Sequence, residues 1–209
     1  MRPFEQVTGI VAPLLRNDVD TDTIIPAAFM RSLSTDPAEG LFARWRFRPD
    51  GTEAPGFVLN DPPFRCPVFL LAGRNFGCGS SRENAVWALA GFGIRGVVAL
   101  GFSDIFRENA LKNGLLPMQL APHDHARLAD AATRKPTCVT VDVSATTLTL
   151  PDGTALGFPL AVRQQARLLR GQDEIDETLA QVDRIDHFLA RHRARFPWLY
   201  AIEHVPERA

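Results

Sequence analysis

The pattern that most limits the fold is a series of short apolar segments separated by helical ones between residues 67 and 120. Buried strands are predicted at residues 67–72, 96–100 and 115–120, and helices at residues 81–92 and 103–113, the second ending at Gly114. Strands that alternate with helices pair in parallel, because the crossover between them is long enough to hold a helix. The sequence therefore predicts an α/β fold with a parallel βαβαβ core.

The flanking sequence predicts more β structure and a helical end. Residues 7–15 form a short apolar run, residues 138–143 and 147–150 carry β-branched side chains, and Pro151-Asp152-Gly153 is typical of a hairpin turn. From Pro159 onward, apolar residues recur at helical spacing up to Gly171 and again from Ile175 to Leu189, and we interpret both stripes as core contacts. We expect one domain over residues 1–209, with a core to about residue 158 and a helical extension over residues 159–209.

Charge and hydropathy exclude several classes of protein. Lys plus Arg number 23 against 24 for Asp plus Glu, so the net charge of -1 gives no basic footprint for nucleic acid. The apolar stretches are far shorter than the ~20 residues of a membrane helix. Residues 1–12 also lack the apolar block of a signal peptide. We therefore expect a cytoplasmic protein without a nucleic-acid or membrane partner.

The cysteines and histidines do not form a ligand pattern for a metal. The three cysteines are odd in number and widely spaced, at Cys66, Cys78 and Cys138, which argues against disulfides and against C-x-x-C ligation. His123 and His125 follow Pro122 in what we interpret as a polar loop. The chain itself is expected to bind no metal and no cofactor.

The segment that carries chemistry is the run Gly73-Arg74-Asn75-Phe76-Gly77-Cys78-Gly79-Ser80-Ser81-Arg82-Glu83-Asn84-Ala85, between a predicted strand and a predicted helix. At the carboxyl end of a parallel strand, glycines allow a tight turn and the next helix directs free N–H groups at a ligand, so anions bind well there. A P-loop needs Lys after its second glycine, and a dinucleotide fingerprint needs glycine where Arg82 stands. Neither nucleotide motif is present.

Two interpretations of Ser80 remain open from the residues alone. Ser80 and Glu83 fit a capping box, in which the serine begins the helix and has no other role. Alternatively, Arg82 and the helix amides hold a carboxylate while the same positive dipoles favour the deprotonated form of the Ser80 hydroxyl. In that case the serine acts as a base.

The segment from Asn75 to Glu83 resembles the signature of the aconitase superfamily's swivelling domain, particularly that of isopropylmalate dehydratase small subunits. The run from Asn17 to Pro26 (NDVDTDTIIP) resembles the opening motif of that family. Residues 57–60, 103–106 and 113–117 are similar to later blocks, in the expected order. The resemblance implies a three-layer β/β/α swivelling domain with a C-terminal helical segment.

The resemblance also implies a function. The chain would be one subunit of a hydro-lyase that interconverts 2-isopropylmalate and 3-isopropylmalate through isopropylmaleate in leucine biosynthesis. A large partner subunit, in a heterodimer or heterotetramer, would hold a [4Fe-4S] cluster whose open iron acts as a Lewis acid on the substrate, a small hydroxy-dicarboxylic acid.

The same resemblance assigns roles to residues of this chain. Ser80 would remove the proton beside a carboxylate, Arg82 would clamp a carboxylate, and Ser81 and the amide of Gly79 would bind the remaining oxygens. Asp22 would lie near this site. Substrate preference would depend on the segment after Pro26, which contains Phe29, Met30 and Arg31.

Two departures from the family pattern keep alternatives open. Asn84 stands where the signature usually has His, and Asp176 stands where a glycine is common. A related small subunit acting on a methylmalate or dimethylmalate would share the same chemistry. A non-catalytic module that binds a carboxylate and regulates a partner is a further alternative, although Ser80 and Arg82 are both present.

Overall fold

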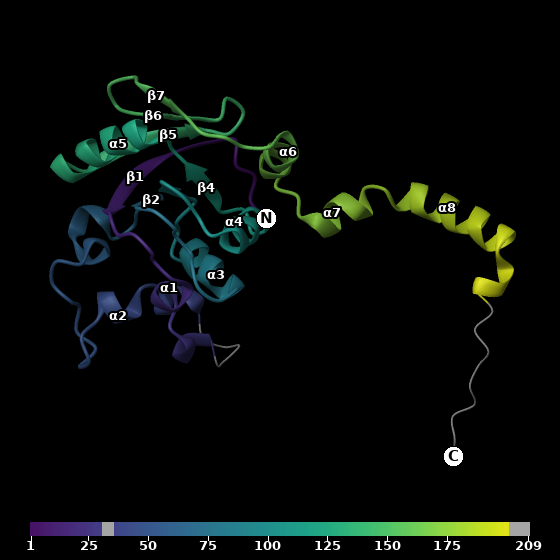
Figure 1. Ribbon diagram of the computed structural model, residues 1–209, viewed down its shortest axis with the longest axis horizontal. Helices are drawn as coiled ribbons and strands as arrows, with labels where there is room; N and C mark the ends of the chain where they lie inside the picture. Colours follow the sequence, from purple (N-terminus) through teal and green to yellow (C-terminus); the bar gives the residue numbers. More distant parts are fainter. Residues whose placement is uncertain (31–35, 201–209) are drawn as a thin grey trace, which may run out of the picture. The chain divides into compact units, whose positions relative to one another are not determined.

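The computed structural model describes residues 1–30 and 36–200. The chain divides into two compact units, residues 1–171 and residues 172–209 (Figure 1). The first unit contains the whole sheet and the helix α6 (Val162–Arg170). The proposed domain organisation, with a helical extension from residue 159, stays a prediction.

One mixed sheet of seven strands forms the centre of the first unit. Its strands, in the spatial order β4-β3-β2-β1-β5-β6-β7, are β1 (Gln6–Leu14), β2 (Phe69–Ala72), β3 (Gly96–Ala99), β4 (Leu116–Gln119), β5 (Thr137–Asp142), β6 (Thr147–Thr149) and β7 (Ala155–Gly157). The strands β1 to β4 are parallel, whereas β5 pairs antiparallel with β1 and begins a meander. The first strand of the chain is thus the central strand of the sheet.

Two helices make the predicted crossovers between β2, β3 and β4. They are α3 (Glu83–Gly91) and α4 (Asp104–Lys112), and each lies inside its predicted range. The parallel βαβαβ core and the α/β class are therefore confirmed. The shorter helices α1 (Thr21–Ile24) and α2 (Ala43–Arg46) follow β1.

Alternate residues of the parallel strands face two different hydrophobic cores. Ala12, Leu70 and Val97 pack with residues of α1, α3 and α4, whereas their neighbours Phe69 and Val98 pack with residues of β5 to β7 and of the helix α5 (Pro122–Arg134). Figure 1 shows α1 and α3 on one side of the sheet and α5 on the other. Both faces of these strands are buried, which explains why their sequences are continuous apolar runs.

The interpretation of His123 and His125 as residues of a polar loop is wrong, because both lie in α5. Pro122 occupies the first turn, where a missing N–H costs nothing, and Leu128 and Ala132 are buried. His125 is only 7% exposed, and its Nε2 lies 2.7 Å from the carbonyl oxygen of Ala72 at the end of β2. The helix was not predicted because most of its residues are polar and only a narrow face is buried.

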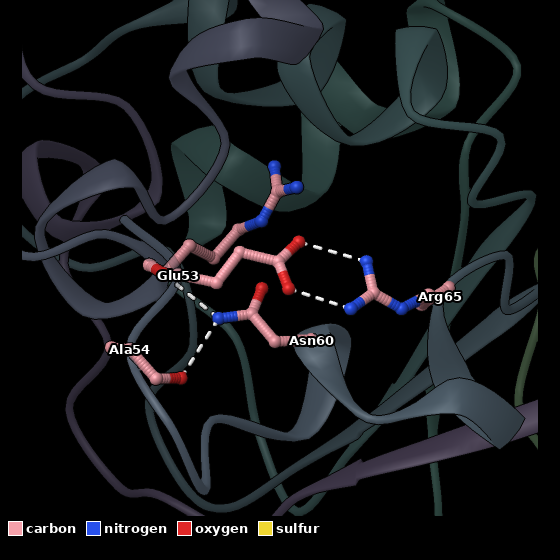
Figure 2. Close-up of polar contacts among 5 residues, drawn as sticks. Glu53, Ala54, Asn60 and Arg65 are labelled. Carbon is pink, nitrogen blue, oxygen red and sulfur yellow. Dashed lines mark hydrogen bonds and ion pairs between the residues drawn. The ribbon is translucent and has the colours of Figure 1, made fainter. Parts of the chain in front are cut away.

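The segment between α2 and β2 contains few regular elements and is held by polar contacts (Figure 2). The side chain of Asn60, 7% exposed, donates to the carbonyl oxygens of Arg46 and Ala54 at 2.7 and 3.0 Å. Glu53 and Arg65 form a two-pronged ion pair at the surface, with N–O distances of 2.8 and 2.6 Å. These bonds take the place of a strand or helix in fixing the path of the chain.

The second unit contains α7 (Glu174–Leu179), α8 (Val182–Arg195) and the 3-10 turn η5 (Pro197–Leu199). Asp176 has a structural explanation here, since Asp173 and Asp176 form a reciprocal capping box at the start of α7. In residues 172–200, the helices α7 and α8 have no buried residue, and Ile175, Leu179, Val182 and Ile185 are between 39% and 69% exposed. The core contacts expected of this stripe are therefore not formed within residues 172–200.

The earlier stripe, in α6, is partly confirmed. Of the predicted stripe, Leu160 and Leu169 are partly buried and pack against the core that contains β5 to β7, and the helix ends at Gly171 as expected. Leu168, which was not part of the predicted stripe, is buried in the same core. Val162, however, is 80% exposed, so the core contact predicted for it is wrong.

In residues 1–30 and 36–200, no helix is both long enough and apolar enough to cross a membrane.

Candidate active site

The candidate site is the loop of residues 73–82, which leaves the carboxyl end of β2 and leads into α3. Its backbone adopts the left-handed region at Asn75, Gly77 and Gly79, with φ of 56°, 75° and 90°. Gly77 is required on two grounds, because a Cβ there would also lie 2.2 Å from Cγ of Phe106. The glycines therefore make the loop compact against α4.

A second loop, residues 15–20 between β1 and α1, runs alongside the first. Backbone hydrogen bonds join the two from Asp18 N to Arg74 O at 2.9 Å, from Gly77 N to Val19 O at 2.8 Å, and from Thr21 N to Cys78 O at 2.9 Å. Because β1 and β2 are parallel neighbours, their carboxyl ends meet at the same edge of the sheet. The two signature motifs thus form one structure.

Side chains of the first motif extend this pairing. The Oδ1 atom of Asn17 accepts from the N–H of Arg74 at 2.8 Å, and the Thr21 hydroxyl donates to the carbonyl of Ser80 at 3.0 Å. Sequence reasoning placed only Asp22 near the site and missed Asn17 and Thr21. The available signal was a run of polar residues directly after a buried strand that neighbours β2.

Arg82 and Asp22 form an ion pair, in which Nη1 of Arg82 donates to Oδ1 of Asp22. Their side chains are 25% and 44% exposed, so the guanidinium is held at the protein surface and is not buried. Guanidinium carries five N–H donors in a fixed plane. The pair therefore orients Arg82 while leaving donors for a carboxylate ligand.

Ser80 and Ser81 are exposed, and within the described residues their hydroxyls have no hydrogen-bond partner. The capping-box interpretation of Ser80 is wrong. The helix α3 begins at Glu83 with Arg82 in the N-cap position, and the Glu83 carboxylate accepts instead from Nδ2 of Asn113 at 2.8 Å. Ser80 is therefore not occupied by a helix cap and is accessible to a ligand.

Cys78 lies in the same loop and is partly buried. Burial, followed by the negative charges of Asp20 and Asp18, raises the pKa of the Cys78 thiol. In residues 1–30 and 36–200, no three or more His, Cys, Asp or Glu side chains are grouped so that they could hold a metal ion. Cys78 is a loop residue with a thiol that resists ionisation.

The residues proposed for substrate preference directly follow α1 in the sequence. Phe29 and Met30 belong to the 3-10 turn η1 (Ala27–Met30) and pack against the core beneath α1 and α3. Phe29 also lines an open cavity of about 850 Å³, together with Phe47 and Arg44. Ser80 and Arg82 are not among the residues lining this cavity. Arg31 lies outside the described residues. The presence of Asn84, where the family signature usually has His, has no structural explanation.

Comparison with known proteins agrees with this fold and site. A sequence model of the aconitase C-terminal domain matches residues 1–123. A solved structure, described as 3-isopropylmalate dehydratase from Methanocaldococcus jannaschii, matches with a TM-score of 0.61 and 25% identity, over 86% of this chain and 99% of that one. Fold and loop together define an aconitase C-terminal domain.

Curated relatives identify the family within this class of domain. The 3-isopropylmalate dehydratase small subunit of Brucella anthropi is 44% identical over 200 residues, which is 95% of this chain and 100% of the relative. The corresponding protein of Cupriavidus necator is 46% identical over 205 residues, which is 96% of this chain and 99% of the relative. The chain belongs to the family of 3-isopropylmalate dehydratase small subunits.

Proposed function

We propose that this chain is the small subunit of a 3-isopropylmalate dehydratase, a hydro-lyase that interconverts 2-isopropylmalate and 3-isopropylmalate in leucine biosynthesis. The observation that carries the proposal is the exposed Ser80-Ser81-Arg82 segment, in which Arg82 is oriented by Asp22 and the serine hydroxyls are unpaired within the described chain. Family membership gives the reaction, and this segment gives the groups that this chain supplies to it.

Ser80 is proposed as the base of the elimination. Its hydroxyl oxygen, deprotonated, takes the proton from the carbon beside a substrate carboxylate, the double bond forms, and the hydroxyl group leaves from the neighbouring carbon. Arg82 holds one carboxylate, while Ser81 and the amide of Gly79 bind the remaining oxygens. Addition of water with the opposite placement of hydroxyl and hydrogen completes the isomerisation.

The partner is proposed to be a large subunit that carries a [4Fe-4S] cluster, in a heterodimer or a heterotetramer in the cytoplasm. The signature loop supplies a single cysteine, Cys78, whereas such a cluster is held by several thiolates, so we assign the cluster to the partner and no cofactor to this chain. When bound, the cluster supplies a Lewis acid for the departing hydroxyl.

Substrate choice is proposed to depend on the segment that contains Phe29, Met30 and Arg31. Phe29 supports this role through its position on a large, open and mainly apolar cavity, which suits a branched alkyl group or an apolar side chain of the partner. Substitution of Phe29 by Ala should change the relative kcat/KM values for isopropylmalate and smaller methylmalates more than it changes either kcat.

The proposal is tested by an anaerobic assay of this chain with its large subunit, following isopropylmaleate formation from 3-isopropylmalate. Ser80→Ala should lower kcat by about 10²- to 10⁴-fold, the range of a general base, without loss of the complex. Ser144→Ala, an exposed serine in the turn after β5, is the matched control and should keep full activity.

Other results would change the proposal in defined ways. Full activity of Ser80→Ala would exclude the serine as the base. A wild-type complex that forms and ignores isopropylmalate would contradict the substrate, and methylmalate and dimethylmalate would be assayed next.

A further inference from the structure

Two residues with left-handed backbone conformations contact each other near the start of the loop of residues 73–82, which we call the Ser80 loop. Asp18 has φ of 53° and Asn75 has φ of 56°, and they come from the loops that follow β1 and β2. In residues 1–30 and 36–200, only Phe42 and Thr146 share this feature among the other non-glycine residues. Such conformations persist where the surrounding structure holds them in place, and they cluster at functional sites.

Two hydrogen bonds lock this pair together. Nδ2 of Asn75 donates to Oδ1 of Asp18 at 2.9 Å, and the backbone N–H of Asp18 donates to the carbonyl of Arg74, also at 2.9 Å. Asn and Asp tolerate the left-handed region better than other L-residues with a Cβ, since their short polar side chains bond locally. The residue types, the backbone and the side-chain bond therefore support one another.

The contacts between the two segments that involve Ser80 and Arg82 come after this pair in the sequence. From Asp18 and Asn75 the two loops run side by side to the bridge between Asp20 and Cys78, to the Thr21 hydroxyl on the carbonyl of Ser80, and to the ion pair of Asp22 and Arg82. A rotation at this pair would move each of these contacts. Asp18 and Asn75 therefore lie at the start of the paired segments that lead to Ser80 and Arg82.

We propose that Asp18 and Asn75 are positioning residues for the reaction, acting as a clamp that fixes the Ser80 loop against residues 19–22. Both side chains are exposed and lie outside the two hydrophobic cores, so the clamp adds little to the stability of the fold. Its effect falls on the placement of Ser80 and Arg82, where small displacements are costly to catalysis. The inference rests on the proposed function of the loop.

An exchange of side chains tests the clamp in the complete complex with the large subunit. Asn75→Asp places two carboxylates face to face and should lower kcat for isopropylmalate about 10- to 100-fold. Asp18→Asn retains an acceptor oxygen and should cost much less. The double variant with Asn75→Asp and Asp18→Asn restores a donor and an acceptor with their positions reversed, and should recover most of the lost kcat.

Two further variants separate positioning from stability. Asn75→Gly suits the positive φ and removes only the side-chain contact, so it should lower kcat while leaving the midpoint of thermal unfolding close to that of the wild type. Thr146→Gly relaxes a left-handed residue in the turn between β5 and β6, at φ of 51°, and should leave kcat unchanged.

The outcomes distinguish the clamp from the function on which it rests. A wild-type complex that does not convert isopropylmalate would contradict the proposed function. A wild-type complex that converts it, with Asn75→Asp and Asn75→Gly equally active, would overturn the clamp. A double variant no better than Asn75→Asp alone would overturn the pairing of the two side chains.

Discussion

Asp22, in the first turn of α1, pairs with Arg82, which stands sixty positions later at the N-cap of α3. The carboxylate holds a long and otherwise flexible side chain in one orientation, in the segment that also exposes Ser80 and Ser81. Since the pair is only partly buried, its value lies in orientation more than in stability.

We expect Asp22→Asn to lower kcat/KM for isopropylmalate by roughly tenfold, the equivalent of ~1.4 kcal/mol, because Arg82 loses its charged partner and samples other orientations. Arg82→Lys should cost more, since an ammonium lacks the planar donors that match a carboxylate. Steady-state kinetics of the reconstituted complex measures both. Unchanged kinetics of Asp22→Asn would show that the ion pair is dispensable.

Gly77→Ala should destabilise the fold strongly. The substitution combines a left-handed backbone, at φ of 75°, with a Cβ 2.2 Å from the Phe106 ring, and we expect a loss of about 2–4 kcal/mol. Gly153→Ala is the matched control, because φ there is 84° and nothing lies within 4 Å of the added Cβ. Urea denaturation should separate the two, and equal losses would mean that α4 moves aside without cost.

The thiol of Cys78 should be the slowest of the three cysteines to react with iodoacetamide. Burial, together with the charges of Asp20 and Asp18, raises its pKa, so less thiolate is present at a given pH, and the rate should increase as the pH rises. Cys66 and Cys138 are exposed and serve as internal controls. Mass spectrometry of peptides from the native and the urea-unfolded protein makes the comparison. Faster reaction at Cys78 than at the two exposed thiols would contradict the expectation.

The surface ion pair of Glu53 and Arg65 should make stability depend on pH (Figure 2). Hydrogen bonding to Arg65 holds the pKa of Glu53 below its usual value, so the pair stabilises the fold above the pKa of an unfolded Glu, about 4.3, and the benefit is lost as pH falls through the lower, folded value. Glu53→Gln should therefore lower the midpoint of thermal unfolding slightly at pH 7. The difference should disappear in acid, and a difference that persists there would point to a contact other than the charge pair.

The sequence predicted the parallel core well because β2 and β3 are short, fully buried apolar runs and β4 is buried at every residue except Gln119. It failed at α5, where only a few residues face the core and His125 supplies a buried polar contact to Ala72. Helix periodicity is weak evidence when the buried face is this narrow.

The sequence named the residues of the candidate site but not the contacts among them. The local spacing of Ser80 and Glu83 fits a capping box. Nothing in that spacing reveals that the Glu83 carboxylate instead accepts a hydrogen bond from Asn113, thirty positions later. In the same way, the contact of Asp18 with Asn75 depends on β1 and β2 being neighbours, which is a property of the sheet. Long-range polar contacts of this kind have no signature in either segment alone.

The central place of β1 has a consequence for biosynthesis. β1 is synthesised before β2 and β5, which cover its two edges in the folded sheet, and residues 17–22 are synthesised before the loop of residues 73–82 against which they pack. Until then the nascent chain presents an open strand edge, the kind of surface that aggregation recruits and chaperones shield. Slow translation between β1 and β2 would prolong that exposure.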